Sequence, residues 1–363
     1  MTATTTRRTF LQRTAGLSAL SLAAIGWQQI ARAAEPGPPK IKIGQIGTAH
    51  AHATKLEVYR RSPDYEVAGI VESDPQLRAR AQHNAAYRDL PWMTEEQLLN
   101  QPGLQAVLVE TRVRDLLDTA ERCIGAGKHV HLDKPAGESF SQYQRLLGAA
   151  ADRSLLVQMG YMFRYNPAVM LLRRFLREGW LGEVFQIDAV ISKVVPRDDR
   201  QALAEYPGGI MFELGSHVVD LMVGVLGKPD RVQSVARHSS PQDDKLLDNM
   251  LAICEYPRAI ATLKSTAEEV DGGRRRNFIV CGTAGTFNIE PIEAPKVRYS
   301  LDRGRGPYAQ GTHEISFEPY VRYVADAADM AKIIRGEKSC DFPYPHDLAV
   351  QETVLRASGL AVS

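Results

Sequence analysis

The chain has 363 residues, which is more than one average domain requires and predicts about two domains with a sizeable core. Hydrophobic residues make up 44% and charged residues 24%, the usual proportions of a globular protein. The formal net charge is +1, and the notable basic run at 274–276 follows Asp271-Gly272-Gly273 as a solvated loop would. Composition therefore gives no indication of a nucleic-acid-binding protein.

Residues 1–33 predict a twin-arginine signal peptide. Thr6-Arg7-Arg8-Thr9-Phe10-Leu11-Gln12 has the export motif, an apolar run follows at 15–27, and Ala31-Arg32-Ala33 has the small-x-small cleavage pattern. An attached amphipathic helix and an uncleaved anchor are the alternatives, but the run is shorter than the roughly 18 residues that a membrane span needs. We expect no stable membrane span, a partner in the twin-arginine export machinery, and a periplasmic or otherwise exported protein. Removal of four leader arginines leaves 40 basic and 43 acidic residues, a net charge of −3.

A proline-rich linker is expected at 34–39, and a nucleotide-binding domain at 40–160. In this domain apolar strands alternate with helices. This alternation is typical of right-handed crossovers and a parallel sheet. The expected strands are 40–46, 66–71, 106–109, 130–132 and 155–159, and the expected helices are 51–61, 75–81, 116–126 and 143–151.

The turn after the first strand is a partial dinucleotide fingerprint. Gly47 occupies the first glycine position, but Ala49 and His52 stand at the second and third. Glu72 ends the second strand about 20 residues later, where a carboxylate binds the ribose hydroxyls of NAD. Because Ser73 and not arginine follows it, a 2′-phosphate has no obvious partner. We therefore expect NAD, with NADP possible.

Two histidine pairs suggest a metal site. Alternate residues of a strand share a face, as His50 with His52 and His129 with His131 would. Zinc would need a third protein ligand, however, and the remaining histidines offer no helical or knuckle spacing. We expect no metal.

The stretch from Gly127 to Pro135 predicts a helix stop, a short buried strand and a polar tip with Asp133 and Lys134. An ionic pair at the carboxyl end of a strand lies where open α/β sheets bind ligands. An ordinary surface turn is the alternative.

Residues 161–363 predict an α+β domain, because strands with few intervening helices favour a mostly antiparallel sheet. The expected strands are 185–195, 232–238, 250–256, 260–265, 277–281 and 286–289, and the expected helices are 168–178, 322–334 and 347–357.

One further helix, after Gly208-Gly209, places three ionisable residues on a single stripe. Glu213, His217 and Asp220 stand at i, i+4 and i+7 among apolar neighbours. Buried ionisable groups need a partner or a function. A satisfied core histidine and a glutamate at a helix N-terminus are the alternative interpretation.

Together these residues resemble the Gfo/Idh/MocA oxidoreductase family. The specific parts are Gly-Lys-His-Val at 127–130 with Asp133-Lys134-Pro135, and Gly-Gly-x(3)-Glu-x-Gly-x-His-x-x-Asp at 208–220; Cys-Gly-Thr-Ala-Gly at 281–285 is also similar. The resemblance implies a Rossmann domain that holds the nicotinamide and an open-sheet domain that covers the substrate and often forms oligomer contacts. We therefore expect a homo-oligomer.

The resemblance also implies roles for individual residues. The lysine of the family's Glu-Lys-Pro motif falls on Lys134, and its aspartate–histidine pair falls on Glu213 and His217. An ammonium can stabilise an alkoxide, and an imidazole can accept the hydroxyl proton; Glu213 could orient His217. The resemblance further implies a cis Lys134–Pro135 bond.

The other expected site residues lie around these catalytic candidates. Cofactor-binding residues are expected at Gly47, Thr48, Ala49, Glu72, Thr111, Asp133 and Lys134. Substrate-binding residues are expected at Tyr161, Arg164, Tyr165 and Asp220.

The sequence departs from the family pattern at three places. Asp133 stands for glutamate, Glu213 stands for aspartate, and residues 110–114 lack the usual Thr-Pro-Asn-like loop. Our first interpretation is an exported NAD(P)-dependent oxidoreductase that acts on a secondary hydroxyl or keto group of a sugar or polyol with a tightly held cofactor. A redox-assisted glycosidase that uses retained NAD, and a non-catalytic sugar-binding protein on the same fold, are the alternatives.

Overall fold

The structure is a computed structural model that describes residues 38–363. The predicted signal peptide and residues 34–37 of the linker lie outside the described residues. Residues 39–363 form one compact unit. No helix of the described part is long and apolar enough to cross a membrane.

The first sheet has six parallel strands in the order β3-β2-β1-β4-β5-β6, which confirms the predicted Rossmann domain. Its strands are nearly continuous apolar runs because helices cover both faces of such a sheet. The strands are β1 Ile41–Ile46, β2 Tyr65–Val71, β3 Trp92–Met93, β4 Leu104–Val109, β5 His129–Leu132 and β6 Val157–Met159. Only the two-residue β3 was not expected.

Its helices follow the strands in chain order. They are η1 Ala53–Lys55, α1 Leu56–Arg61, α2 Pro75–Ala81, η2 Ala85–Tyr87, α3 Glu95–Leu99, η3 Val113–Asp115, α4 Leu116–Gly125 and α5 Phe140–Asp152. Helix α2 begins as the sequence predicts. Asp74 accepts hydrogen bonds from the backbone N–H groups of Gln76 and Leu77, and Pro75 takes the first helical position.

The second sheet has eight strands in the order β14-β13-β12-β11-β7-β10-β9-β8. All neighbours are antiparallel except β7 and β10, as predicted for a mostly antiparallel sheet. The strands are β7 Val184–Val190, β8 Arg231–Arg237, β9 Asn249–Glu255, β10 Ile260–Thr266, β11 Asn277–Gly282, β12 Gly285–Ile289, β13 Lys296–Leu301 and β14 Gly311–Ser316. β7 ends five residues earlier than expected, and β13 and β14 were not expected.

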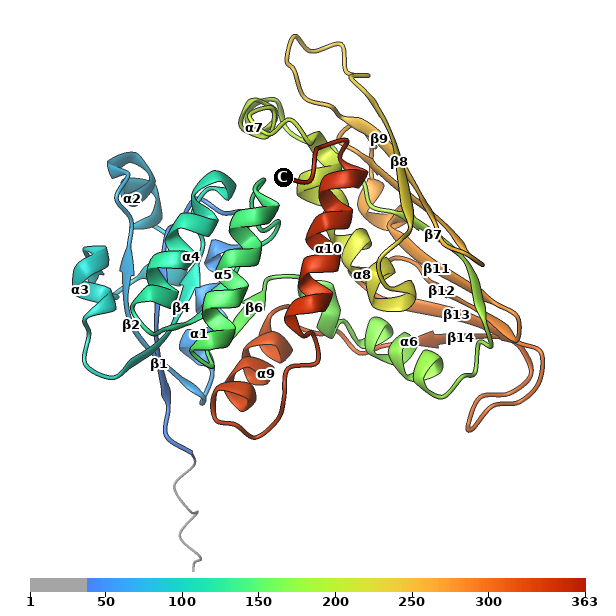
Figure 1. The fold of residues 1–363 in the computed structure, drawn as a ribbon, viewed down its shortest axis with the longest axis horizontal. Helices are drawn as coiled ribbons and strands as arrows, with labels where there is room; N and C mark the ends of the chain where they lie inside the picture. The colour runs from blue at the N-terminus through green and yellow to red at the C-terminus, as the bar shows by residue number, and fades with distance from the viewer. Residues whose placement is uncertain (1–37) are drawn as a thin grey trace, which may run out of the picture. The chain divides into compact units, whose positions relative to one another are not determined.

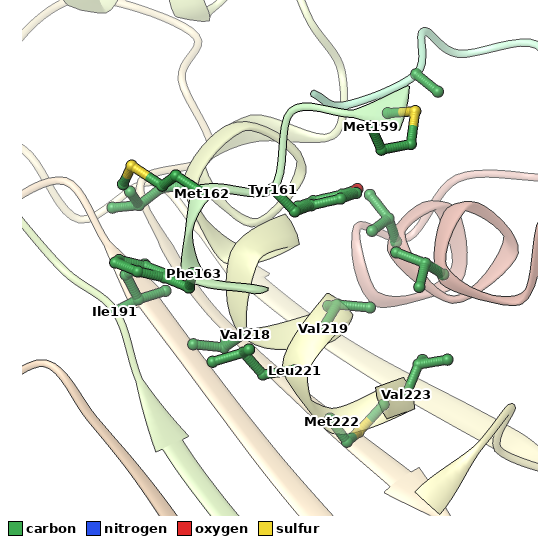
Figure 2. Close-up of a cluster of buried hydrophobic side chains, with 14 of the residues drawn as sticks. Met159, Tyr161, Met162, Phe163, Ile191, Val218, Val219, Leu221, Met222 and Val223 are labelled. Atoms are coloured by element: carbon green, nitrogen blue, oxygen red, sulfur yellow. The ribbon is translucent and has the colours of Figure 1, made fainter. Parts of the chain in front are cut away.

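Helices α6, α8 and α10 lie against one face of this sheet (Figure 1). The helical elements are η4 Met162–Tyr165, α6 Pro167–Arg177, α7 Arg197–Leu203, η5 Met211–Gly215, α8 Ser216–Leu226, η6 Gly272–Arg275, α9 Val324–Ile334 and α10 Tyr344–Ala357. Figure 2 shows α8 among buried apolar side chains, with Tyr161 and Phe163 from the segment after β6 on one side. This packing fixes α8 relative to the end of the Rossmann sheet.

Two late helices return to the Rossmann half. The Tyr65 hydroxyl donates to the carbonyl of Ala327 in α9 at 2.7 Å, and Met330 of α9 is fully buried with Ile41. In α10, the Gln351 side-chain amide donates to the carbonyl of Gly137 at 2.6 Å. The two halves are therefore joined by more than the chain at residues 160–161, where the sequence predicts the domain boundary.

Candidate active site

A cleft of about 790 Å³ lies at the carboxyl ends of β1, β2 and β4. The sheet order reverses between β1 and β4, and open α/β sheets bind ligands at such a switch point. Four of the predicted cofactor-binding residues line it together, namely Gly47, Ala49, Glu72 and Thr111.

The turn after β1 is fixed to the end of β2. Thr48 donates two hydrogen bonds to Glu72 Oε2, from its backbone N–H at 2.8 Å and from its hydroxyl at 2.7 Å. Gly47 has φ +91°, and a Cβ there would lie 2.5 Å from the backbone nitrogen of Thr111. Only glycine fits such a close approach of two turns. The cleft, this turn and the Glu72 carboxylate fit a dinucleotide. A carboxylate at this place would accept hydrogen bonds from the ribose hydroxyls.

Lys134 belongs to the Rossmann domain, and its side chain contacts the C-terminal half of the molecule. It follows β5, its peptide bond to Pro135 is cis as expected, and the side chain is almost fully buried. Lys134 Nζ donates to the backbone oxygen of Glu213 at 2.7 Å and lies 3.5 Å from Glu213 Oε1. The structure therefore brings the predicted lysine and glutamate together.

Glu213 faces two ammonium groups and not His217. It belongs to η5, a π-helical turn, which holds one residue more than an α turn and so interrupts the predicted stripe. Glu213 Oε2 lies 3.6 Å from Lys193 Nζ. Burial alone would raise the pKa of Glu213, but Lys134 and Lys193 outweigh it and lower this pKa to about 2. The predicted orientation of His217 by Glu213 has no hydrogen bond to support it among the described residues.

His217 is buried beside the lysine. Burial, together with Lys134, lowers the pKa of His217 well below its ordinary value. Its Nδ1 has no hydrogen-bond partner in the described part of the chain. Aromatic rings surround it, with ring centroids 5.1 Å away at Phe163, 6.0 Å at His52 and 6.1 Å at Tyr161. Burial therefore favours the neutral imidazole, whose Nδ1 is left without a partner in the described part of the chain.

A cluster of buried ionisable groups surrounds Asp133, the residue before Lys134. His50 Nδ1 lies 3.0 Å from Asp133 Oδ2, and His52 Nδ1 lies 3.2 Å from Asp133 Oδ1. Lys55 Nζ contacts Asp133 Oδ2 at 2.7 Å and Glu110 Oε1 at 2.9 Å. Asp133 is thus held among basic groups next to the backbone of Lys134, whose N–H donates to Asp133 Oδ1 at 2.7 Å.

Charge and burial act in opposite directions in this cluster. Burial raises the pKa of a carboxyl, but His50, Lys55 and His52 outweigh it at Asp133 and hold that pKa well below its usual range. Burial and the neighbouring Asp133 raise the pKa of Glu110. Burial lowers the pKa of His52 to about 4, so that its imidazole is neutral.

Sequence reasoning missed Lys55 and Glu110 and left out a possible third metal ligand. Glu110 directly follows the apolar strand β4, which is the one local signal that could have drawn attention to it. The expectation of no metal rested on the lack of a third ligand at a suitable spacing. That reason is wrong, because Asp133 comes from the turn after β5, and the ligand atoms of His50, His52 and Asp133 lie within 4.8 Å of one another.

Two predicted substrate residues form a buried ion network. The Arg164 guanidinium donates to both carboxylate oxygens of Asp220 and, at 2.6 Å, to Asp347 Oδ1. All three side chains are at most 3% exposed. The carboxylate of Asp220 is therefore paired with Arg164. A substrate role for Arg164 and Asp220 remains a prediction from the sequence, and their observed contacts hold η4, α8 and α10 together.

The two predicted tyrosines differ in their surroundings. Tyr161 is buried in the apolar cluster of Figure 2, beside His217. The Tyr165 hydroxyl donates to Asp329 Oδ2 at 2.7 Å, which joins η4 to α9. Tyr161 is thus the tyrosine next to the catalytic candidates, and Tyr165 contributes to the packing of α9.

Comparison with known proteins agrees with this geometry. Residues 41–161 match the family model described as oxidoreductase family, NAD-binding Rossmann fold, and residues 169–288 match the model of the GFO/IDH/MocA C-terminal domain. Among curated relatives, the uncharacterized oxidoreductase YdgJ of Escherichia coli is 26% identical over 72% of each chain. Trans-1,2-dihydrobenzene-1,2-diol dehydrogenase of Sus scrofa is 25% identical over 57% of this chain and 61% of its own length.

Solved structures share the fold. The WlbA dehydrogenase from Bordetella pertussis, solved in complex with NADH and UDP-GlcNAcA, has a TM-score of 0.71 and 16% identity, covering 88% of this chain and 97% of that one. The family match, the cleft of the Rossmann domain and the contact of Lys134 with Glu213 together identify an NAD(P)-dependent oxidoreductase. The chain belongs to the Gfo/Idh/MocA family.

Proposed function

We propose that the protein oxidises or reduces a secondary hydroxyl or keto group of a sugar or polyol, with NAD as the cofactor. The observation that carries the proposal is the contact of Lys134, which follows a strand of the Rossmann sheet, with Glu213, which lies four residues before His217. The amine comes from the Rossmann half and the imidazole from α8, and Glu213 joins the two halves through its contact with Lys134.

Each side chain has a role that its surroundings support. Two of the three N–H donors of Lys134 are directed at Glu213, which leaves one for a substrate oxygen. An ammonium in a water-poor site stabilises the negative charge that develops on an alkoxide oxygen. His217 is neutral and accepts the hydroxyl proton. NAD, when bound, supplies the hydride acceptor or donor.

The cofactor preference rests on Glu72. Its carboxylate is fixed by Thr48 and by the backbone N–H of Asp74, which donates to Glu72 Oε1 at 3.0 Å. A fixed carboxylate suits the two free ribose hydroxyls of NAD and repels the 2′-phosphate of NADP. We therefore favour NAD over NADP.

The substrate class and the location are supported by less direct observations. The family resemblance, and a relative by fold that was solved with UDP-GlcNAcA, support a sugar-like substrate. The arginine pair of residues 7 and 8 supports export, and free nicotinamide is scarce outside the cytoplasm, so we propose a cofactor that stays bound between turnovers. Homo-oligomerisation is likewise proposed from the family resemblance.

The test combines cofactor identification with matched variants. Mass spectrometry of the small molecules released from denatured native protein should find NAD or NADH. In a screen of sugars and polyols, Lys134→Met and His217→Gln should each lower kcat by about 10²- to 10³-fold while NADH still binds. The controls are Lys128→Met and His83→Gln, which change a lysine and a histidine away from the cleft. Unchanged turnover in Lys134→Met or His217→Gln would exclude the proposed roles.

A further inference from the structure

The His50-x-His52 pair that replaces part of the glycine fingerprint has no role in the reaction proposed above. Both imidazoles direct Nδ1 at the carboxylate of Asp133, at 3.0 and 3.2 Å. The Asp133 side chain is fully buried, and those of His50 and His52 are 7% and 15% exposed. The three residues come from the carboxyl ends of β1 and β5, which the sheet brings to one edge.

Both ring nitrogens of His50 have polar neighbours within 3.2 Å. His50 Nε2 lies 3.0 Å from the carbonyl oxygen of Lys134, which can only accept, so Nε2 carries the hydrogen. The backbone N–H of His52 donates to His50 Nδ1 at 3.2 Å, so this nitrogen presents its lone pair. His50 Nδ1 also lies 3.0 Å from Asp133 Oδ2, so a metal ion bound there would take this lone pair in place of the His52 N–H. At this distance a proton on Nδ1 or a metal ion joins the nitrogen to the carboxylate, and the experiment below distinguishes the two.

The distances suit a metal ion. Ligand atoms about 2.0–2.1 Å from a tetrahedral zinc ion lie roughly 3.3 Å from one another. The two nitrogen–oxygen distances around Asp133 are close to this value. Histidine ligands of metals donate their second N–H to a carbonyl or carboxylate, as His50 does to Lys134.

A fourth group lies beside these three. Glu110 Oε2 is 3.9 Å from His50 Nδ1, is buried, and has no hydrogen-bond partner among residues 38–363. Lys55 compensates one of the two buried carboxylates, since it contacts both Asp133 and Glu110.

We propose that His50, His52 and Asp133 bind one divalent transition-metal ion of the zinc class, with Glu110 as a fourth ligand. The ion would join the turn after β1 to the turn after β5 and so fix the backbone of Lys134. The proposed site is distinct from the groups that carry out the hydride transfer, because neither histidine is assigned to the substrate or the cofactor.

The test measures metal binding without reference to turnover. Wild-type protein is stripped with a chelator, dialysed, and titrated with Zn²⁺ by calorimetry, and Co²⁺ is added to a second sample to record visible absorption. We expect one equivalent of Zn²⁺ per chain and the absorption bands of Co²⁺ bound to nitrogen and oxygen ligands. His50→Gln and His52→Gln should weaken Zn²⁺ binding at least 100-fold, and His83→Gln, which alters an exposed histidine, should not.

Two results would overturn the proposal. The first is wild-type protein that is folded by circular dichroism and binds less than a tenth of an equivalent of Zn²⁺. The second is equal Zn²⁺ affinity in wild type, His50→Gln and His52→Gln, which would identify an adventitious ion only. The wild-type measurement decides even if a variant fails to fold. NADH binding to the same samples, followed by fluorescence, shows separately whether the proposed oxidoreductase function holds.

Discussion

The network around Arg164 tests whether this arginine binds the substrate or stabilises the fold through its buried ion pairs. We predict that Arg164→Met destabilises the fold strongly. The substitution leaves Asp220 and Asp347 buried without their shared cation, at 2% and 1% side-chain exposure. Methionine keeps much of the volume of arginine, so the loss comes mainly from charge.

The expected magnitude follows from this burial. Removal of one partner from a buried ion pair costs about 3–5 kcal/mol, because the remaining charge has no water to solvate it. Arg164 interacts with two carboxylates through four hydrogen bonds, so the upper part of that range applies. Burial already raises the pKa of Asp347, and loss of Arg164 should raise it further.

The assay is urea unfolding followed by circular dichroism, with Arg173→Met as the matched control. Arg173 and Arg164 both place their guanidinium groups over the Phe342 ring, at 4.8 and 4.2 Å from its centre. Arg173, however, pairs with Asp341 at 3.5 Å near the surface, where an ion pair contributes about 0–1 kcal/mol. If both variants unfold at similar urea concentrations and Arg164→Met instead raises the KM for substrate, the structural assignment is refuted.

Three further predictions concern the cofactor cleft and one buried acid. Glu72→Ala should weaken NADH binding by roughly 10- to 100-fold and reduce the preference over NADPH, measured by fluorescence titration, because charged hydrogen bonds contribute about 1.5–3 kcal/mol. Gly47→Ala should abolish NADH binding and lower the thermal midpoint, whereas Gly125→Ala, where a Cβ meets nothing within 4 Å, should change neither. Burial raises the pKa of Asp326 from 3.8 to about 7, so the folded state holds this proton more tightly, and stability falls as pH rises from about 4 to 7 by up to about 1.4 kcal/mol per pH unit. Asp326→Asn should remove this slope, and identical pH profiles of the thermal midpoint would contradict the assignment.

The sequence was sufficient for the Rossmann half because its strands are buried on both faces and read as short apolar runs between helices. It failed for β14, where most residues are exposed and no alternation marks the strand. It also failed for the short α7, whose sequence is mostly charged and polar. These two elements bury little, whereas β13 was missed although it buries alternate residues.

The candidate site was predictable where the chemistry is local and unpredictable where it depends on distant pairing. Lys134 and His217 stand in short motifs that a sequence shows directly. The partners of Arg164 lie 56 and 183 residues away, so nothing local distinguishes a substrate arginine from a buried structural one. Similarly, an α-helical repeat cannot indicate the π-helical turn at Met211–Gly215, which contains Glu213 and precedes His217.

The replacement of the family's glutamate by Asp133 and of a fingerprint glycine by His52 has one physical explanation. The Asp133 carboxylate has close neighbours. Lys55 Nζ donates to its Oδ2 and the backbone N–H of Lys134 to its Oδ1, each at 2.7 Å, and a Cβ on Gly160 would lie 2.8 Å from Oδ1. A glutamate would add a methylene to this space, and overpacking of that kind costs about 1–3 kcal/mol. We infer that the shorter carboxylate and the histidine are adapted to each other.

A double-mutant cycle tests this inference. Asp133→Glu should destabilise the protein by about 1–3 kcal/mol. In a His52→Gly background the ring that lies 3.2 Å from Asp133 is gone, and the longer carboxylate has room. The double variant should therefore be more stable than the sum of the two single changes predicts, by at least about 1 kcal/mol, which is within the range for residues in contact. If the two changes add to within about 0.5 kcal/mol in urea unfolding, the two residues are independent, and the shorter side chain at position 133 needs another cause.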